Sequence, residues 1–297
     1  MTQHTSDTTE ASSIGFLGNA WVPKTQMLIS IDDGGFRQGV TAVERLRTYD
    51  HQIFAIDAHL DRWDHSTAEL SLGQLPARSV TRALLHELLE RNQALLDSQG
   101  EVGITLFATP GTALSASPTF GMHVNSLNFK LIQQRQTSGQ PLVITSVRQP
   151  SPECWPRTVK SRSRLHYYLA DREAQQHSPL ASGLLIDDDG TVTETSISNI
   201  AVVKANQIQS PRRDQVLHGI TQAFVEELAT ELGIRWSHSP ITPEKLMAAD
   251  EVLLMGTDGG LWFADQINGQ TIGNARPGGV YSRLLEHFQR RLSTGMD

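Results

Sequence analysis

The sequence contains a single cysteine, no surplus of basic residues and no long apolar run. One cysteine, Cys154, excludes an intramolecular disulfide framework and any metal site built from several cysteines. The 25 Lys and Arg residues against 32 Asp and Glu give a formal net charge of −7, which argues against a dedicated nucleic-acid-binding protein. No apolar run approaches the roughly 18 residues of a membrane-spanning helix, so no membrane span is expected. The 297 residues are enough for one large domain or two ordinary ones, with a sizeable core.

The N-terminal residues 1–14 are mostly polar. They contain neither Lys nor Arg and lack the apolar stretch of a signal peptide. We therefore expect them to form a flexible tail on a cytoplasmic protein.

The composition predicts a boundary near the middle of the chain. A polar stretch beginning at Gln133 and a Pro-containing loop at 149–152 indicate a connector, which we place at 136–150. It separates an N-terminal domain over 15–135 from a C-terminal domain over 151–297. The expected strands and helices do not alternate cleanly and no G-x-G-x-x-G motif is present, so a doubly wound sheet is not expected.

Periodicity and turn residues predict the individual elements. In the first half they indicate strands at 27–31, 101–109 and 121–132, a hairpin over 43–56, a helix from 59, and a helix over 79–96 with Val80 facing inward. In the second half they indicate a helix over 164–177, a hairpin over 183–195 around Asp189-Gly190, strands within 199–209 and at 252–255, a helix over 220–232 with Ile220 and Phe224 facing inward, and a hairpin turn over 267–270.

Lys160 is the first candidate for chemistry. It lies in a stretch with three arginines, where neighbouring cations would lower the pKa of an amine, as a Schiff-base lysine requires. The alternative is a solvated basic stretch. Glu194 is the second candidate, since an alternating strand places it on the same side as Val192; a charge there is usually found on an edge strand.

Two segments have the character of anion sites. Residues 217–221 open a helix, whose free N–H groups and dipole favour an anion, although an ordinary helix start has the same pattern. The turn 256–260 is rich in glycine and follows a buried strand, so it either cradles a phosphate or simply reverses the chain.

Metal sites are not predicted. His59 and Asp61 are two residues apart and do not share a helix face, so together with His65 they do not form a metal site. The run that begins at Asp187 lacks the ligand spacing and distal Glu of a calcium loop, which favours a hairpin turn. Cys154 lies in a Pro-rich loop, and no nearby histidine supports a role as nucleophile.

The order and spacing of several motifs carry more weight than any one of them. From about residue 27 to 290 the chain resembles the fold-type IV, or class IV, pyridoxal-phosphate enzymes, which include branched-chain aminotransferases, D-amino-acid aminotransferases and aminodeoxychorismate lyases. The resemblance rests on six ordered motifs: Asp33-x-Gly35-Phe36-x-x-Gly39-x-x-x-Val43-Glu44-x-x-Arg47, His59-Leu60-Asp61-Arg62, Lys160 with Glu173-Ala174, Glu194-x-x-x-Ser198-Asn199-Ile200, Gly219-Ile220-Thr221 and Gly256-Thr257.

The resemblance implies an α/β fold (α+β) with an N-terminal α/β sandwich and a C-terminal pseudo-β-barrel. It also implies pyridoxal 5'-phosphate between these domains and a homodimer whose pockets borrow loops from the partner. Lys160 would form the Schiff base and move a proton, and Glu194 would pair with the pyridine nitrogen. The remaining cofactor-binding residues would be Arg62, Ser198, Asn199, Ile220, Thr221 and Thr257, with the phosphate on Arg62, the Thr257 hydroxyl and the N–H groups of Ile220 and Thr221.

The substrate is open at this point. Arg45 is a cation where relatives with apolar substrates carry small or apolar residues, so it either faces a substrate carboxylate or pairs outside the pocket. The other candidate substrate-binding residues are Arg164, Asp258 and Gly259. Three hypotheses follow: an aminotransferase acting on an amino acid and a 2-oxo acid, an aminodeoxychorismate lyase giving 4-aminobenzoate and pyruvate, and a non-enzymatic binding protein with a degenerate site. Arg164, four residues after Lys160, is typical of the lyases.

Overall fold

The computed structural model describes residues 13–114 and 117–294 and separates into two compact units. Unit 1 extends to Leu127 and also includes Val159–Ser163, whereas unit 2 comprises Asn128–Thr158 and the chain from Arg164 onward. Most of the predicted tail, residues 1–12, lies outside the described residues, and the first strand already begins at Ile14. Among the helices of the described ranges, none is both long and apolar enough to cross a membrane.

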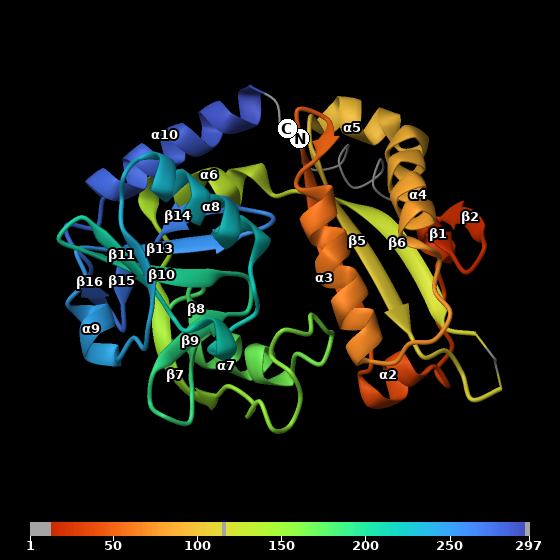
Figure 1. Cartoon of the computed structure of the whole chain (residues 1–297), viewed down its shortest axis with the longest axis horizontal. Helices are drawn as coiled ribbons and strands as arrows, with labels where there is room; N and C mark the ends of the chain where they lie inside the picture. The colour runs from red at the N-terminus through yellow and green to blue at the C-terminus, as the bar shows by residue number, and fades with distance from the viewer. Residues whose placement is uncertain (1–12, 115–116, 295–297) are drawn as a thin grey trace. The chain divides into compact units, whose positions relative to one another are not determined.

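Unit 1 is built on a six-stranded sheet in the order β2-β1-β6-β5-β3-β4, with antiparallel pairing throughout. One face carries Leu46, Ile104 and Met122, which are buried in a core with residues of the overlying helices (Figure 1). The strands are β1 (Ile14–Leu17), β2 (Ala20–Pro23), β3 (Ala42–Tyr49), β4 (Gln52–Ile53), β5 (Val102–Thr109) and β6 (Thr119–Ser126), and the helices are η1 (Lys24–Gln26), α2 (Gly34–Gln38), α3 (Ile56–Glu69), α4 (Arg78–Arg91) and α5 (Gln93–Gln99).

Two predicted elements of unit 1 are wrong. Residues 27–31 form no strand, since they join no ladder of the sheet, whose edge on this side is β2. The helix predicted over 79–96 is broken at Asn92, whose side chain accepts from Ile14 N (2.8 Å) and donates to Ile14 O (2.8 Å) on β1. Val80 is 49% exposed, so it does not face inward.

Unit 2 contains a ten-stranded mixed sheet that branches at β10. The main path is β12-β11-β10-β9-β8-β7-β15-β16, and β13 pairs with β10 and then with β14. The strands are β7 (Leu142–Arg148), β8 (Ser182–Ile186), β9 (Val192–Thr195), β10 (Asn199–Lys204), β11 (Gln207–Ser210), β12 (Trp236–His238), β13 (Glu251–Gly256), β14 (Gly260–Phe263), β15 (Gln266–Ile267) and β16 (Gln270–Thr271).

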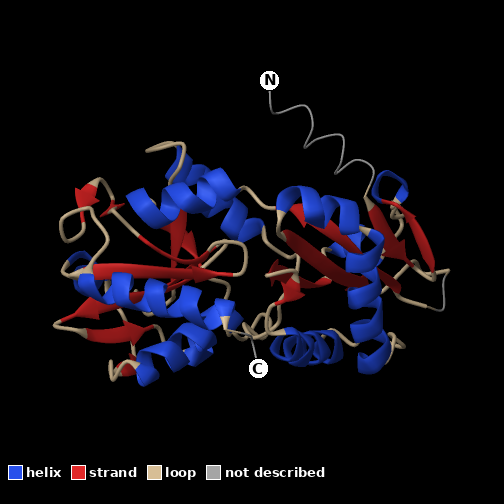
Figure 2. Ribbon diagram, turned by 90° about the horizontal axis from the view of Figure 1, so that it is seen from above, coloured by secondary structure: helices blue, strands red, loops and turns tan. Residues whose placement is uncertain are grey.

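Helices flank this sheet, as the blue ribbons of Figure 2 show. The helix α7 packs on β7 and β8, while α8 and α10 pack on β13 and β14. The approach of α7 is close, since a Cβ added at Gly183 on β8 would lie 2.4 Å from the backbone of Ala170. The helices of unit 2 are α6 (Phe129–Ser138), η2 (Arg213–Gln215), α7 (Leu165–Gln175), α8 (Ile220–Glu231), α9 (Pro243–Met247) and α10 (Gly279–Ser293).

The predicted elements of unit 2 agree well with the structure, and the mixed α/β fold class is confirmed. The hairpin around Asp189-Gly190 is β8–β9, and Gly190 has the positive φ of 81° that its turn requires. Leu228 on α8 is buried, as its place on the predicted face requires, but Thr221 and Val225 are buried in place of the predicted Ile220 and Phe224. Where a connector at 136–150 and a strand to 132 were expected, the chain forms α6 and β7.

Candidate active site

The backbone of Lys160 is held on both sides within unit 1. Its carbonyl oxygen accepts from Val43 N on β3 at 3.0 Å, and its N–H donates to Ser66 Oγ on α3 at 3.1 Å. The next residue, Ser161, forms an antiparallel bridge with Ala42. Val159 is only 8% exposed. The backbone of the segment that carries Lys160 is therefore an ordered part of the fold.

Arg62 lies on α3, four residues before Ser66, and is bound to a buried carboxylate. Its Nε and Nη2 donate to Glu44 Oε1 and Oε2 on β3, at 2.7 and 2.9 Å. The Nδ1 atom of His59 lies 2.8 Å from the same Oε2 atom. Burial alone raises the pKa of Glu44, but the Arg62 guanidinium and the hydrogen bonds from Arg62 and His59 outweigh it and lower that pKa to about 2.

This cluster of Glu44, His59 and Arg62 was not predicted from the sequence. His59 and Glu44 occur in the family motifs but were assigned no role in the site, although His59 and Arg62 are three apart on one helix and thus share a face. Asp61 lies elsewhere on α3, where it pairs with Arg78 at 2.6 Å and is 71% exposed. Within the ranges that the structure describes, no group of three or more His, Cys, Asp or Glu side chains is arranged to hold a metal ion.

Glu194 lies on β9 in unit 2 and is 4% exposed. Because β9 lies between β8 and β10, the edge-strand interpretation of this charge is wrong. Four neutral groups donate to the carboxylate: Tyr167 Oη to Oε1 (2.7 Å), Asn199 Nδ2 to Oε2 (3.1 Å), Leu217 N to Oε1 (3.4 Å) and Gln149 Nε2 to Oε1 (3.5 Å). The pKa of Tyr167 is raised well above its usual value by burial and by the adjacent Glu194.

Asn199 connects Glu194 to the start of α8. Its Nδ2 also donates to Leu217 O at 2.9 Å, and a Cβ added at Gly219 would lie 1.8 Å from Asn199 Oδ1, so a larger residue there would displace the Asn199 amide. Ser198, by contrast, lies in the turn before β10, where its hydroxyl is 2.8 Å from Thr195 Oγ1. The structure therefore places Asn199 beside Glu194 and gives Ser198 a role in the turn.

The first turn of α8 has the character of an anion site. Its N-cap, Gly219, has no side chain that could accept a hydrogen bond from the first N–H groups of the helix, which include those of Ile220 and Thr221. Thr257 lies in the turn that joins β13 to β14 through the pair Gly256 and Gly260. A free helix N-terminus and a threonine hydroxyl are both suitable donors to a phosphate.

Residues 41–267 match the family described as amino-transferase class IV. The chain belongs to this family. It is 28% identical to D-alanine aminotransferase of Bacillus licheniformis, over 91% of this chain and 93% of that protein. It is also 28% identical to branched-chain-amino-acid aminotransferase-like protein 2 of Arabidopsis thaliana over 96% of this chain, but spans only 51% of that protein. Aminodeoxychorismate lyase of Bacillus subtilis (strain 168) is 26% identical over 80% of each chain.

Solved structures confirm the fold of this class IV chain. The branched-chain amino acid aminotransferase of Escherichia coli superposes with a TM-score of 0.87 over 94% of both chains, at 20% identity. A second branched-chain amino acid aminotransferase, from T.th. and solved with pyridoxamine 5'-phosphate, also gives a TM-score of 0.87, over 95% of both chains, at 22% identity. Enzymes of this family use pyridoxal phosphate as their cofactor.

The chain offers residue types that suit this cofactor. Lys160 supplies an amine, Arg62 and the α8 N-terminus supply donors for a phosphate, and Glu194 supplies a carboxylate that is already ordered. Burying a carboxylate is costly unless hydrogen bonds compensate it, and the four neutral donors to Glu194 do so. The buried and oriented Glu194 is thus the observation that fits a cofactor with a protonatable ring nitrogen.

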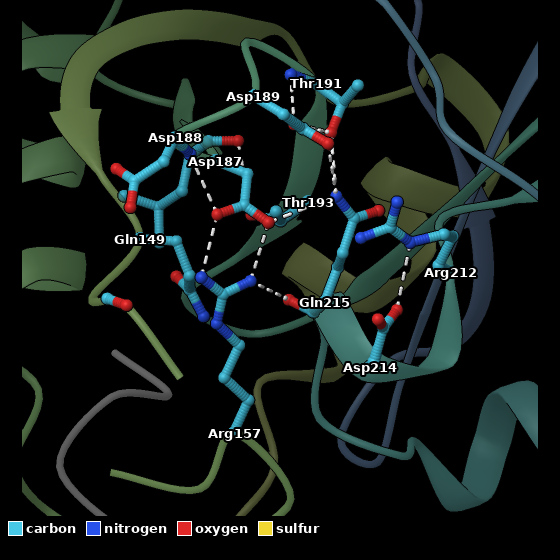
Figure 3. A network of polar contacts seen from close by, with 12 residues as sticks. Gln149, Arg157, Asp187, Asp188, Asp189, Thr191, Thr193, Arg212, Asp214 and Gln215 are labelled. Carbon is cyan, nitrogen blue, oxygen red and sulfur yellow. Dashed lines mark hydrogen bonds and ion pairs between the residues drawn. The ribbon is translucent and has the colours of Figure 1, made fainter. Parts of the chain in front are cut away.

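A buried ion pair fixes the segment that leads to Lys160. Arg157 forms a two-pronged pair with Asp187, with Nη1 to Oδ2 at 2.6 Å and Nη2 to Oδ1 at 2.7 Å (Figure 3). Gln215 Nε2 donates to Asp187 Oδ2 (3.1 Å) and to Thr191 Oγ1 (2.9 Å). The arginine is 8% exposed, so the ion pair belongs to a buried network beside the β8–β9 hairpin.

The open face of the unit 1 sheet contains a cavity of about 430 Å³. Arg45 Nη1 donates to Thr105 Oγ1 at 3.1 Å, and Thr105 lines the cavity. The pKa of His123, also on its wall, is lowered to about 4 mainly by burial, with smaller effects from nearby cations. The lining residues are Ile29, Ile31, Gly35, Phe36, Thr41, Thr105, Phe107, Thr109, His123 and Arg162.

The other candidate substrate residues lie in unit 2. Arg164 Nη2 donates to Ser196 O, and its guanidinium lies 4.4 Å from the centre of the Tyr167 ring. Asp258 is exposed and Gly259 is buried, where a Cβ would meet the Trp262 ring at 2.8 Å. Arg164 therefore lies beside Tyr167, which itself donates to Glu194.

Proposed function

We propose that this enzyme transfers an amino group between an amino acid and a 2-oxo acid, with Lys160 as the catalytic residue. The ordered, buried carboxylate of Glu194 carries the proposal, because an acidic group at the ring nitrogen keeps that nitrogen protonated. When bound, pyridoxal phosphate supplies an electron sink for the bond broken at the substrate Cα.

Each residue has a separate part in this proposal. Lys160 binds the cofactor covalently through its amine and later holds the proton that moves to and from the substrate. Arg62, the N–H groups of Ile220 and Thr221, and the Thr257 hydroxyl hold the phosphate. Tyr167 and Asn199 orient Glu194 by hydrogen bonds of 2.7 and 3.1 Å.

Lys160→Ala tests the catalytic assignment. We expect wild-type protein loaded with the cofactor to absorb at about 410–420 nm, and borohydride followed by peptide mapping to label Lys160. The variant should lose the covalent link and retain some cofactor through its phosphate contacts. Labelling of another lysine would show that the assignment is wrong. A screen of amino acids with a 2-oxo acid acceptor, with the new 2-oxo acid as readout, then identifies the donor.

An aminodeoxychorismate lyase is the second candidate, supported by the relative from Bacillus subtilis and by Arg164 four residues after Lys160. The same screen separates the two reactions. A lyase releases pyruvate and 4-aminobenzoate from aminodeoxychorismate without a 2-oxo acid acceptor, whereas an aminotransferase requires the acceptor for repeated turnover. We favour the aminotransferase, because the guanidinium of Arg164 is already engaged by Ser196 and Tyr167.

A further inference from the structure

The side-chain hydrogen bonds that the structure describes for the Glu44 carboxylate all come from residues of α3. Arg62 occupies both oxygens, at 2.7 and 2.9 Å, and His59 Nδ1 lies 2.8 Å from Oε2. The side chains of Glu44 and His59 are each 1% exposed, and that of Arg62 is 10% exposed. The three groups therefore form a compact cluster between one strand and one helix, in which water competes little for the hydrogen bonds.

The protonation state of this cluster follows from its geometry. An ionised carboxylate only accepts hydrogen bonds, so His59 must carry its hydrogen on Nδ1 and donate it to Glu44. The other ring nitrogen, Nε2, is buried and has no hydrogen-bond partner in the structure. Burial lowers the pKa of His59 more than Glu44 raises it, which keeps the ring neutral. The side-chain hydrogen bond that the structure describes for His59 is thus the one from Nδ1 to Glu44.

We propose that His59 and Glu44 are positioning residues, which fix the direction of the Arg62 guanidinium for the cofactor phosphate. This inference rests on the proposed function, in which Arg62 binds that phosphate. An unrestrained arginine samples many rotamers and loses that freedom when it binds an anion. The two-pronged bond to Glu44 removes the freedom in advance, and the His59 donor holds the carboxylate in the orientation that the guanidinium needs.

Pyridoxal, which lacks the phosphate, provides the matched probe for this role. We would measure the dissociation constants of pyridoxal phosphate and pyridoxal for the apoenzyme by the absorbance of the lysine-bound compound. Glu44→Gln keeps the shape and removes the charge, and His59→Leu removes the donor. His59→Asn retains a donor near the position of Nδ1. Asp61→Asn on α3 removes a carboxylate that is 71% exposed and pairs with Arg78, so it controls for charge.

We expect Glu44→Gln and His59→Leu to weaken binding of pyridoxal phosphate at least tenfold and binding of pyridoxal less than threefold. His59→Asn and Asp61→Asn should stay within threefold of wild type for both compounds. An equal loss for both compounds in Glu44→Gln or His59→Leu would indicate a general structural role and overturn the proposal, as would unchanged or tighter binding of pyridoxal phosphate. If the wild-type protein binds neither compound, the proposed function fails as well.

Discussion

Asp187→Asn should destabilise unit 2 far more than a loss of one surface charge would. The Asp187 and Arg157 side chains are 9% and 4% exposed, and the two-pronged pair leaves the guanidinium little contact with water. Removing one partner of a buried pair typically costs about 3–5 kcal/mol, because the remaining charge is then buried without compensation. Asparagine keeps one acceptor oxygen, so we expect the lower end, about 3 kcal/mol.

Asp250→Asn is the matched control for this change. Asp250 pairs with Lys204 at 2.7 Å, but these side chains are 50% and 64% exposed. Exposed pairs contribute about 0–1 kcal/mol, so the two variants should differ by about 2 kcal/mol or more. Urea unfolding followed by circular dichroism measures the difference, and amide hydrogen exchange in β8 and β9 shows whether the loss is located there. Equal shifts in the two variants would refute the reasoning.

The difference in the free energy of unfolding between wild type and Asp187→Asn should depend on pH in a definite direction. The hydrogen bond from Arg157 is the main cause that holds the pKa of Asp187 below its ordinary value of 3.8. A carboxyl group with a lowered folded-state pKa stabilises the protein above its unfolded pKa and loses that contribution as the pH falls. The gap between wild type and Asp187→Asn should therefore be complete at pH 7 and shrink below about pH 4.

Two further predictions concern the substrate and the assembly. Arg45→Ala should raise KM at least tenfold, about 1.4 kcal/mol, for a substrate with a second carboxylate such as glutamate, and should leave cofactor binding intact. A preference of the wild-type enzyme for leucine or valine in steady-state kinetics would contradict this prediction. We also propose a homodimer, supported by the exposed Leu165, Tyr168 and Leu169 on α7, and a fully active monomer in sedimentation experiments would contradict this.

The sequence predicted best those elements whose signals are local. The Asp189-Gly190 and Asn268-Gly269 turns fix their hairpins through backbone conformations that these residues adopt easily, and both hairpins are present. The apolar run at 27–31 failed because composition does not show whether a strand has a partner. The helix break at Asn92 depends on Ile14, 78 residues away, and no periodicity reports such a contact.

The residues of the candidate site show the same contrast between local signals and contacts over a long distance in the sequence. Lys160, Arg62 and Glu194 were identified from motifs with fixed spacing along the chain. The contacts that support them join distant segments: Glu44 to Arg62 across 18 residues, Arg157 to Asp187 across 30, and Tyr167 to Glu194 across 27. Pairing between two strands or between a strand and a helix decides such contacts, so the sequence alone could not indicate them.

The three acidic side chains of these contacts are compensated in different ways, and the difference bears on function. Glu44 and Asp187 each receive a two-pronged arginine, which satisfies their oxygens and opposes their charge. Glu194 receives hydrogen bonds from a phenol, two amides and a backbone N–H, all of them neutral. These donors fix the direction of the carboxylate, and its charge also interacts with the Arg157 guanidinium. The hydrogen bonds of Glu194 thus orient a carboxylate as its proposed place at the ring nitrogen requires, whereas those of Glu44 and Asp187 hold two arginines in place.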